Sequence, residues 1–250
     1  MILSDLHQNP IPDGGAASNI VETMPNAPIV VCGEELSALA CGALWRESDR
    51  LLVVADLHLE KGSAFARRGQ MLPPYDTAAT LAALSALVFG YNPMTVVALG
   101  DSFHDNDGPN RLSSYDLSVI RALQRGREWI WVAGNHDDDL PPHVGGERSD
   151  TVAVGPLVLR HEPQSEGSQV GEVAGHFHPA ARVIGRGGSV RRRCFASDGR
   201  RIVMPAFGAY AGGLNILEPV VASLFAAPLM AFVLGAEGVY KVHRSRLRAD

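Results

Sequence analysis

Five short polar motifs contain the residues of this chain that are best suited to chemistry. Each motif follows a short apolar run and contains an aspartate, an asparagine or a histidine. In chain order they are Asp56-Leu57-His58, Gly100-Asp101, Gly134-Asn135-His136-Asp137, His161 and Gly175-His176-Phe177-His178. Carboxylate, amide and imidazole groups are typical ligands of divalent ions such as Mn²⁺, Fe²⁺ or Zn²⁺. The motifs together therefore predict a metal site.

Each motif alone is a weak signal. Asp5-Leu6-His7 has the same letters as the first motif, but no apolar run precedes it, so we assign it to an N-terminal tail. A single histidine or aspartate at a strand end commonly caps a turn or makes a buried hydrogen bond. Alternate side chains of an extended segment also point to opposite sides, so Asp56 and His58 need a twist or bulge to share a metal, as do His176 and His178. The order of all five motifs, each after an apolar run, makes the prediction strong.

The elements around the motifs predict an α/β fold. Apolar runs at residues 51–55, 95–99 and 129–133 are typical of buried strands. Helical patterns lie between them at residues 77–88, with Asp76 at the N-cap, and at residues 112–124. This alternation favours parallel strands, whose carboxyl ends are where ligands bind. Short runs at 152–160, 172–174, 182–185, 190–196 and 201–204 predict a second, more antiparallel sheet.

Length and composition set the domain organisation. The 250 residues are 46% hydrophobic, which is enough for one domain with a sizeable core. Residues 1–27 are predicted to be a loosely ordered tail and residues 28–250 the folded domain. The uncharged stretch 219–236 contains Pro219 and Pro228, so we expect buried core there and no membrane contact. Three scattered cysteines and the lack of a secretory signal predict a cytoplasmic protein.

Charge limits the kind of nucleic-acid contact that the chain can make. The formal net charge of -5 excludes a globally basic nucleic-acid binder, so any such contact needs a local patch. Residues 182–201 carry seven arginines and one aspartate, a local charge of +6 that would attract phosphate groups. Arg191 and Arg193 of this hairpin, with Arg67 near the first motif, are the candidate substrate-binding residues. The alternatives are a charged edge that resists strand addition and, at Arg67, a solvated helix face.

The motif series resembles the calcineurin-like metallophosphoesterase superfamily. The resemblance implies a four-layer sandwich of two mixed β-sheets flanked by helices, with two divalent metal ions, Mn²⁺ first and Fe²⁺ or Zn²⁺ as alternatives. It assigns one metal to Asp56, His58, Asp101 and His178. The other metal is assigned to Asp101, Asn135, His161 and His176, so that Asp101 bridges the pair. His136 corresponds to the catalytic imidazole of the superfamily.

The flanks of the motifs are similar to the bacterial ligase-associated DNA damage response endonuclease family. The matching segments are LGDSFHD, LRHEP, GHFHPA and RRRCFASDGRRIVMPAFGAYAGG, within residues 29–216. This resemblance implies DNA as substrate, with a DNA-repair ligase or helicase as partner. Many superfamily members have an aspartate three residues after the bridging aspartate, where this chain has His104. That arrangement resembles the nuclease subunit of the double-strand-break repair complex, and it leaves His104, Asp105 or Asp137 as the partner of His136.

The predicted function is a two-metal phosphodiesterase that cuts DNA, with single-stranded DNA as the expected substrate. A hydroxide held between the metals would attack phosphorus, and His136 would donate a proton to the leaving oxygen. His104 is the second candidate catalytic residue, with packing or hydrogen bonding behind the site as its alternative role. Two other functions stay open: a small-molecule phosphodiesterase or nucleotidase, and a metal-free scaffold. The apolar C-terminal region is a candidate surface for a homo-oligomer.

Overall fold

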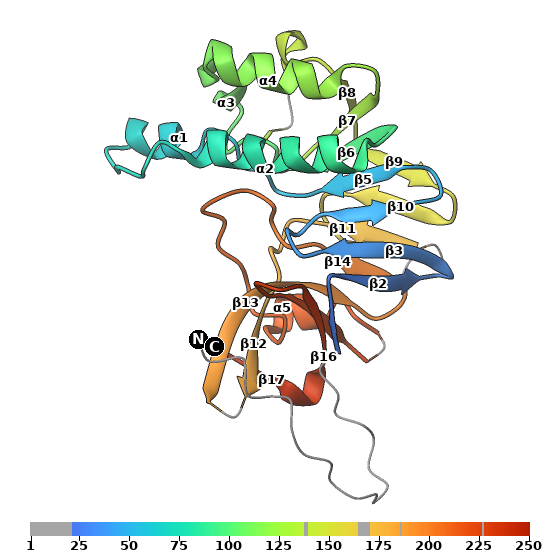
Figure 1. Ribbon diagram of the computed structural model, residues 1–250. Helices are drawn as coiled ribbons and strands as arrows, with labels where there is room; N and C mark the ends of the chain where they lie inside the picture. The colour runs from blue at the N-terminus through green and yellow to red at the C-terminus, as the bar shows by residue number, and fades with distance from the viewer. Residues whose placement is uncertain (1–21, 138–139, 165–170, 186, 227) are drawn as a thin grey trace, which may run out of the picture.

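The computed structural model describes residues 22–137, 140–164, 171–185, 187–226 and 228–250. Two β-sheets pack face to face, and most of the helices cover one of them (Figure 1). The strands are β1 (Glu22–Met24), β2 (Asn26–Val31), β3 (Glu34–Leu39), β4 (Leu44–Arg46), β5 (Leu51–Val54), β6 (Thr95–Leu99), β7 (Glu128–Val132), β8 (Glu147–Ser149), β9 (Thr151–Val154), β10 (Leu157–Arg160), β11 (Gly171–Ala174), β12 (Ala180–Gly185), β13 (Gly188–Ser197), β14 (Arg201–Val203), β15 (Met230–Leu234), β16 (Val239–His243) and β17 (Leu247–Arg248). The α-helices are α1 (Lys61–Arg67), α2 (Asp76–Tyr91), α3 (Gly108–Arg111), α4 (Ser114–Gln124) and α5 (Pro219–Ala222), with 3₁₀ turns at Pro142–Val144 and Arg244–Arg246.

The first sheet has seven strands in the order β2-β3-β4-β5-β6-β7-β8. Strands β5 to β8 are parallel, and β2 to β5 pair in antiparallel fashion. The parallel part follows from the connections, since α2 joins β5 to β6 and α3 with α4 joins β6 to β7, as crossovers require. The carboxyl ends of β5, β6 and β7 therefore meet at one edge.

The second sheet has ten strands and is mixed. Its central strands β10, β11 and β14 are parallel neighbours, and the pairs that surround them are antiparallel. In the register, Arg160 of β10 lies opposite Ala174 of β11. These two strands therefore end at the same level, and the residues that follow them leave the sheet together.

Three hydrophobic clusters hold the layers together. One cluster lies between the two sheets and includes Leu36, Val53, Leu159 and Phe232. A second joins the outer face of the seven-stranded sheet to α2 and α4. A third lies on the outer face of the ten-stranded sheet, beneath α5 and the strands β12 and β17. This confirms the predicted two mixed sheets flanked by helices, although α5 is the only α-helix on the second outer face within the described residues.

Several predicted boundaries were wrong, each for a local reason. Helix α2 begins at Asp76, whose carboxylate accepts a hydrogen bond from the backbone N–H of Gly62 instead of capping its own helix. The helix predicted for residues 112–124 is α4, which begins two residues later, at Ser114, because the Ser113 side chain caps it by accepting a hydrogen bond from the Asp116 N–H. The strand predicted for 152–160 divides into β9 and β10 at Gly155, which has a φ of +56°. The predicted division into a tail of residues 1–27 and a domain of residues 28–250 stays a prediction: β2 begins at Asn26, and residues 1–21 lie outside the described part.

Part of the uncharged C-terminal stretch belongs to the core, as expected, although Val220 is 52% exposed. Pro219 begins the short helix α5, and β15 follows after Pro228. Val221, Leu229 and Val233 are buried in the third cluster. Among the described residues, no helix is both long enough and apolar enough to cross a membrane.

The cluster between the sheets should carry much of the stability. Leu36 is almost fully buried there, whereas Val30 on the neighbouring strand is 52% exposed. We expect Leu36→Ala to lower the free energy of unfolding by about 2–5 kcal/mol, because it removes buried methyl groups and leaves a cavity. Val30→Ala should cost less than about 0.5 kcal/mol. Urea denaturation of both variants measures the difference, and equal losses would contradict this account of the core.

Candidate metal centre

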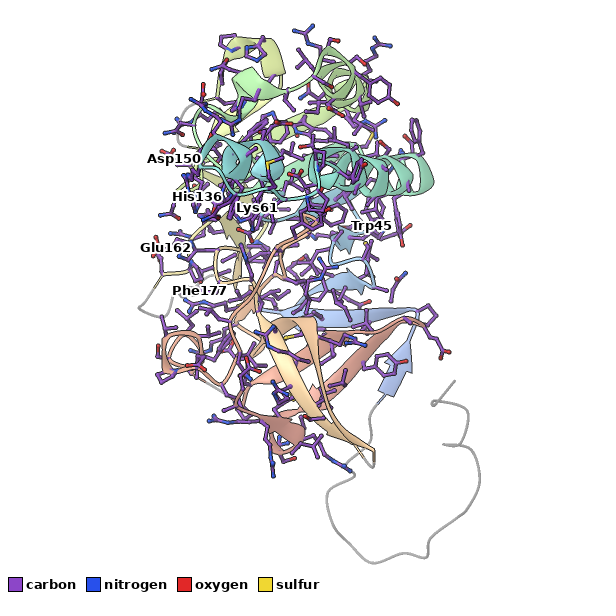
Figure 2. All side chains as sticks on the ribbon, turned by 90° about the vertical axis from the view of Figure 1, so that its left-hand side faces the viewer. Trp45, Lys61, His136, Asp150, Glu162 and Phe177 are labelled. Carbon is purple, nitrogen blue, oxygen red and sulfur yellow. The ribbon has the colours of Figure 1, made fainter. Side chains whose placement is uncertain are left out.

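Five loops from two sheets meet at one edge of the molecule. Asp56 follows β5, Asp101 follows β6 and His136 follows β7, all at the carboxyl ends of parallel strands. From the other sheet, His161 follows β10 and His176 follows β11. Figure 2 looks onto this edge and labels His136, Lys61 and Phe177 near the junction of the two sheets.

Left-handed backbone turns aim the polar side chains into a common space. The φ angles are positive at Asp56 (53°), His58 (44°), Asp101 (44°), His176 (71°) and His178 (46°). Such conformations are uncommon for residues other than glycine, and they cluster at functional sites. They supply the twist that the sequence required, because Asp56 and His58 now face one ligand position instead of opposite sides.

The first triad consists of Asp56, His58 and His178. The Nε2 atoms of the two histidines are 3.1 Å apart, and His178 Nε2 lies 3.4 Å from Asp56 Oδ1. Asp56 is fully buried, and both of its carboxylate oxygens accept from the His176 N–H at 3.1 Å. Two imidazole nitrogens that both present lone pairs cannot hydrogen-bond to each other, whereas a cation between them would accept both lone pairs. The donor set therefore fits a divalent ion.

The second triad consists of Asp101, His161 and His176. His161 Nε2 lies 3.4 Å from Asp101 Oδ1 and 3.1 Å from His176 Nδ1. The Nδ1 atom of His161 is 3.2 Å from the carbonyl oxygen of Leu99, a contact in which only a protonated Nδ1 can donate. That tautomer leaves Nε2 free as a ligand atom, which is the usual arrangement around metal-binding histidines.

Asp101 lies between the two triads. Its Oδ1 faces His161, and its Oδ2 is 4.0 Å from His58 Nε2 and 3.9 Å from His136 Nε2. Asp56 is similarly placed, since its Oδ1 is also 3.7 Å from His161 Nδ1. The two triads are therefore adjacent parts of one cluster.

Burial and neighbouring charges set the protonation of the cluster. Burial, followed by the charge of His178, lowers the pKa of His58 to about 3. Burial and then His161 lower the pKa of His176. At Asp101 and His161 burial opposes the charged forms, but the bond between them outweighs it, so the pKa of Asp101 is lowered and that of His161 is raised. Neutral imidazoles and ionised carboxylates are the forms that bind metals, so the shifts of His58, His176 and Asp101 favour binding, whereas His161 has to release a proton when a cation binds.

Two glycines allow this close approach. A Cβ atom on Gly134 would lie 2.1 Å from the backbone nitrogen of Asp101 and 2.3 Å from its Oδ1. A Cβ on Gly175 would lie 2.7 Å from Asp56 Oδ2. A side chain at either position would displace a carboxylate of the cluster. Steric constraints therefore explain why both motifs contain glycine at these positions.

The chain is similar to a known protein family and to two solved structures. The family model of the calcineurin-like phosphoesterases matches residues 49–186, more than half of the chain. This chain belongs to the calcineurin-like phosphoesterase family. Among solved structures, the nuclease MPE of Pseudomonas putida is similar over 87% of this chain and 100% of its own, with 28% identity and a TM-score of 0.65. The phosphoesterase Yfce of E. coli is similar over 77% of this chain and 98% of its own, with 13% identity and a TM-score of 0.41. No curated protein matches.

Within the phosphoesterase, the predicted metal ligands gather as follows. Six of the seven form the two triads. The seventh, Asn135, lies in the same loop as His136, but its exposed side chain makes no hydrogen bond to the described residues. Its role as a ligand stays a prediction.

The two candidate catalytic histidines lie against each other at the mouth of the cluster. Their rings stack with centroids 5.6 Å apart and an angle of 16° between the planes. The His136 side chain is 49% exposed. The backbone N–H of His136 donates to Asp101 Oδ1 at 3.0 Å. Burial, followed by the charge of Lys61, lowers the pKa of His104. His136 is therefore the more accessible imidazole, and His104 supports its ring.

Of the three partners considered for His136, only His104 contacts its ring. Asp105 instead pairs with Arg111 at 2.8 Å. Asp137 is buried, and its Oδ2 accepts from the Phe103 N–H at 3.0 Å. Burial raises the pKa of Asp137 to about 7. Both aspartates thus hold neighbouring loops in place.

The candidate substrate arginines differ in how they are engaged. Arg67 is 62% exposed and pairs with Asp107. Arg191 pairs with Asp250 and donates to the carbonyl oxygen of Gly213 at 2.6 Å. Arg193 donates to the carbonyl oxygen of Ala206. Arg182 also pairs with Asp250, and the buried Arg201 pairs with Glu172. Fewer arginines of this region are therefore available to bind phosphate than its formal charge suggested.

Sequence reasoning missed two features of the site. Lys61 begins α1 beside the cluster, and its charge acts on both His58 and His104. The loop of residues 205–213 packs against the first motif, with the Gly208 N–H donating to the Asp56 carbonyl oxygen at 3.2 Å. Lys61 lies three residues after the first motif, and no sequence motif includes it. Residues 205–213 lie within the segment that resembles the endonuclease family, but their sequence did not indicate that they would contact the first motif.

Metal binding should stabilise the folded phosphoesterase. Mn²⁺ at 100 times its dissociation constant should raise the free energy of unfolding by about 2.7 kcal/mol for each site. Asp101→Ala should remove most of this gain, because that carboxylate lies between the triads. The control Asp150→Ala should retain it, since Asp150 is 86% exposed and pairs with Arg148, outside both triads. Calorimetric melting temperatures with and without Mn²⁺ measure the effect, and equal gains in both variants would contradict the placement of the metals.

The steric role of Gly134 can be tested in the same way. Gly134→Ala should abolish the Mn²⁺-dependent rise in melting temperature, because its methyl group would displace Asp101. Gly90→Ala in α2 is the matched control, since a Cβ there would meet no atom within 4 Å. It should raise stability by up to about 1 kcal/mol, because alanine is the better helix former. A Gly134→Ala protein that still responds to Mn²⁺ would show that the loop has room.

Proposed function

We propose that this phosphoesterase is a two-metal phosphodiesterase that cuts single-stranded DNA as an endonuclease in DNA repair. The observation that carries the proposal is the pair of adjacent His/Asp triads in one buried cluster. Similarity to a nuclease over 87% of the chain supports nucleic acid as the substrate. The motif flanks, which resemble the ligase-associated endonuclease family, support the repair setting and a ligase or helicase as partner.

The residues that would hold the two cations are those of the triads, with Asn135 as an added ligand. Nitrogen and oxygen donors of this kind suit Mn²⁺, which we propose first, and also Fe²⁺ and Zn²⁺. When bound, a pair of divalent ions supplies positive charge that stabilises both the attacking and the leaving oxygen at phosphorus and lowers the pKa of water. The buried carboxylates fix the ligand histidines, and the left-handed turns keep them aimed at the cluster.

His136 is the proposed proton donor to the leaving oxygen. Its ring is the exposed imidazole at the mouth of the cluster, so it can reach a substrate that the buried histidines cannot. The backbone N–H of His136 is tied to Asp101, and this bond sets the loop relative to the cluster. Stacking on His104 restricts the ring, which makes His104 a positioning residue in this proposal.

Positive charge around the site would hold the phosphate backbone. Lys61 lies at the edge of the cluster, and its Nζ donates to the Tyr210 carbonyl oxygen at 3.1 Å. Arg193 is the substrate-binding candidate without a carboxylate partner among the described residues, while Arg67 and Arg191 would have to open or share their ion pairs. A strand that follows these groups should bind with a strong dependence on salt.

Replacing His136 tests the proton donor. His136→Asn should reduce turnover on DNA by about 10²- to 10⁴-fold while retaining the Mn²⁺-dependent rise in melting temperature. The loss on bis-p-nitrophenyl phosphate should be smaller, because p-nitrophenolate leaves without needing a proton. His243→Asn, in an exposed position far along the chain, is the control. Equal losses on both substrates, or no loss on DNA, would remove His136 from this role.

The substrate itself is tested by comparing three phosphodiesters in the presence of Mn²⁺. Single-stranded DNA circles should be cut faster than duplex DNA of the same length, and cutting should weaken steeply as salt rises. Hydrolysis of bis-p-nitrophenyl phosphate should depend little on salt. Hydrolysis of the small diester without any DNA cutting at low salt would favour a small-molecule phosphodiesterase instead.

A further inference from the structure

A pocket of about 320 Å³ lies beside the metal centre, between helix α2 and the loop of residues 205–213. Small side chains of α2 form one wall, Phe207 and Tyr210 belong to the loop, and Arg193 of β13 closes one side. Ligand pockets in proteins measure about 300–1,000 Å³, so this one is large enough for a group of nucleotide size.

The pocket and the metal centre share a wall that is one backbone segment thick. The N–H groups of Phe207 and Gly208 donate to the carbonyl oxygens of Ala55 and Asp56, at 2.8 and 3.2 Å. A Cβ on Gly208 would lie 2.1 Å from the Leu57 carbonyl oxygen, so only glycine permits this contact. The pocket therefore borders the backbone segment that carries Asp56 and leads to His58.

The shared wall is held in place from both sides. The Ala209 N–H donates to the hydroxyl of Thr80 on α2 at 3.0 Å, and Lys61 donates to the Tyr210 carbonyl oxygen. On the other side, Arg193 donates to the Ala206 carbonyl oxygen at 2.6 Å. The pocket is thus formed before any ligand binds, which reduces the entropy cost of binding.

Arg193 differs from three other arginines of the same sheet, which have carboxylate partners. Arg182 and Arg191 share the carboxylate of Asp250, and Arg201 pairs with Glu172. Arg193 is partly buried, and within the described chain it has no carboxylate in ion-pair range. A guanidinium has five N–H donors and stays charged, so one carbonyl bond leaves most of its capacity unused. An anionic ligand would supply the missing partner.

We infer that this pocket binds the nucleotide adjacent to the cleaved phosphodiester, with its phosphate on Arg193 and its base against the Tyr210 ring. The inference deepens the proposed function and rests on it. Tyr210 is 45% exposed, so its ring is available for stacking. A base paired within a duplex cannot enter such a pocket without first leaving the stack. The pocket would therefore select single-stranded DNA over duplex DNA.

Binding by the Mn²⁺-loaded His136→Asn protein tests this inference without cleavage. Fluorescence anisotropy of a labelled oligothymidylate should show about 10-fold weaker binding when either Arg193→Gln or Tyr210→Ala is added. Arg193→Gln should also reduce the slope of log affinity against log salt by about 0.7, because one phosphate contact is lost. Tyr210→Ala should leave the slope unchanged, since stacking involves no ion. Arg200→Gln, an exposed arginine outside the pocket, is the control for general charge.

The outcomes separate the pocket from the proposed function. If His136-intact protein cuts DNA but the pocket variants bind the oligonucleotide as tightly as their parent, the pocket inference is overturned and the nuclease proposal stands. If the protein hydrolyses bis-p-nitrophenyl phosphate and neither cuts nor binds DNA, both fail. An Arg193→Gln protein that binds weakly with an unchanged salt slope would indicate a purely structural arginine. If the Arg193→Gln protein misfolds, the Tyr210→Ala protein still tests the pocket, because the Tyr210 side chain is exposed and its removal should not disturb folding.

Discussion

The structure depends on the burial of two carboxylates, Asp56 and Asp101, at the junction of its two sheets. Burying a charge is costly unless hydrogen bonds and opposite charges compensate. Here the compensation comes from other motifs: the N–H of His176 donates to Asp56, the N–H of His136 donates to Asp101, and His161 lies against both. Asp56 therefore joins the loop after β5 to the loop after β11 of the other sheet, and Asp101 joins the loop after β6 to the loop after β7. Bound cations would balance the negative charge of the two carboxylates.

The backbone is strained where it serves this cluster. A non-glycine residue in a sparsely populated conformation costs about 1–3 kcal/mol, and five members of the triads have positive φ angles. The surrounding hydrogen bonds and the closely packed Gly134 and Gly175 hold these turns in place. Bound cations would balance the charge of the buried carboxylates and accept the lone pairs of the histidine nitrogens that face one another. This is why the cluster is best understood as a metal centre, and why the pocket beside it shares its rigid wall.

The sequence predicted the parts of this design that are local. Apolar runs that end in polar residues identified β5, β6 and β7, and their parallel pairing brought Asp56, Asp101 and His136 to one edge. The start of α4 after Ser113 and the start of α2 at Asp76 were missed, because they depend on hydrogen bonds that hydrophobic periodicity does not record. Local charge also misled, since Arg182 and Arg191 of the hairpin pair with Asp250, which is distant in the sequence. Contacts made by residues 205–213 arise only from the tertiary fold, so neither the pocket nor the place of Lys61 could be predicted.

We propose that two cations bind side by side between the sheets. Diffraction from crystals grown with Mn²⁺, recorded at the manganese absorption edge, would locate them. We expect two anomalous peaks about 3.5–4 Å apart. One peak should lie among Asp56, His58 and His178, and the other among Asp101, His161 and His176. A single peak, or manganese bound only outside these triads, would contradict it.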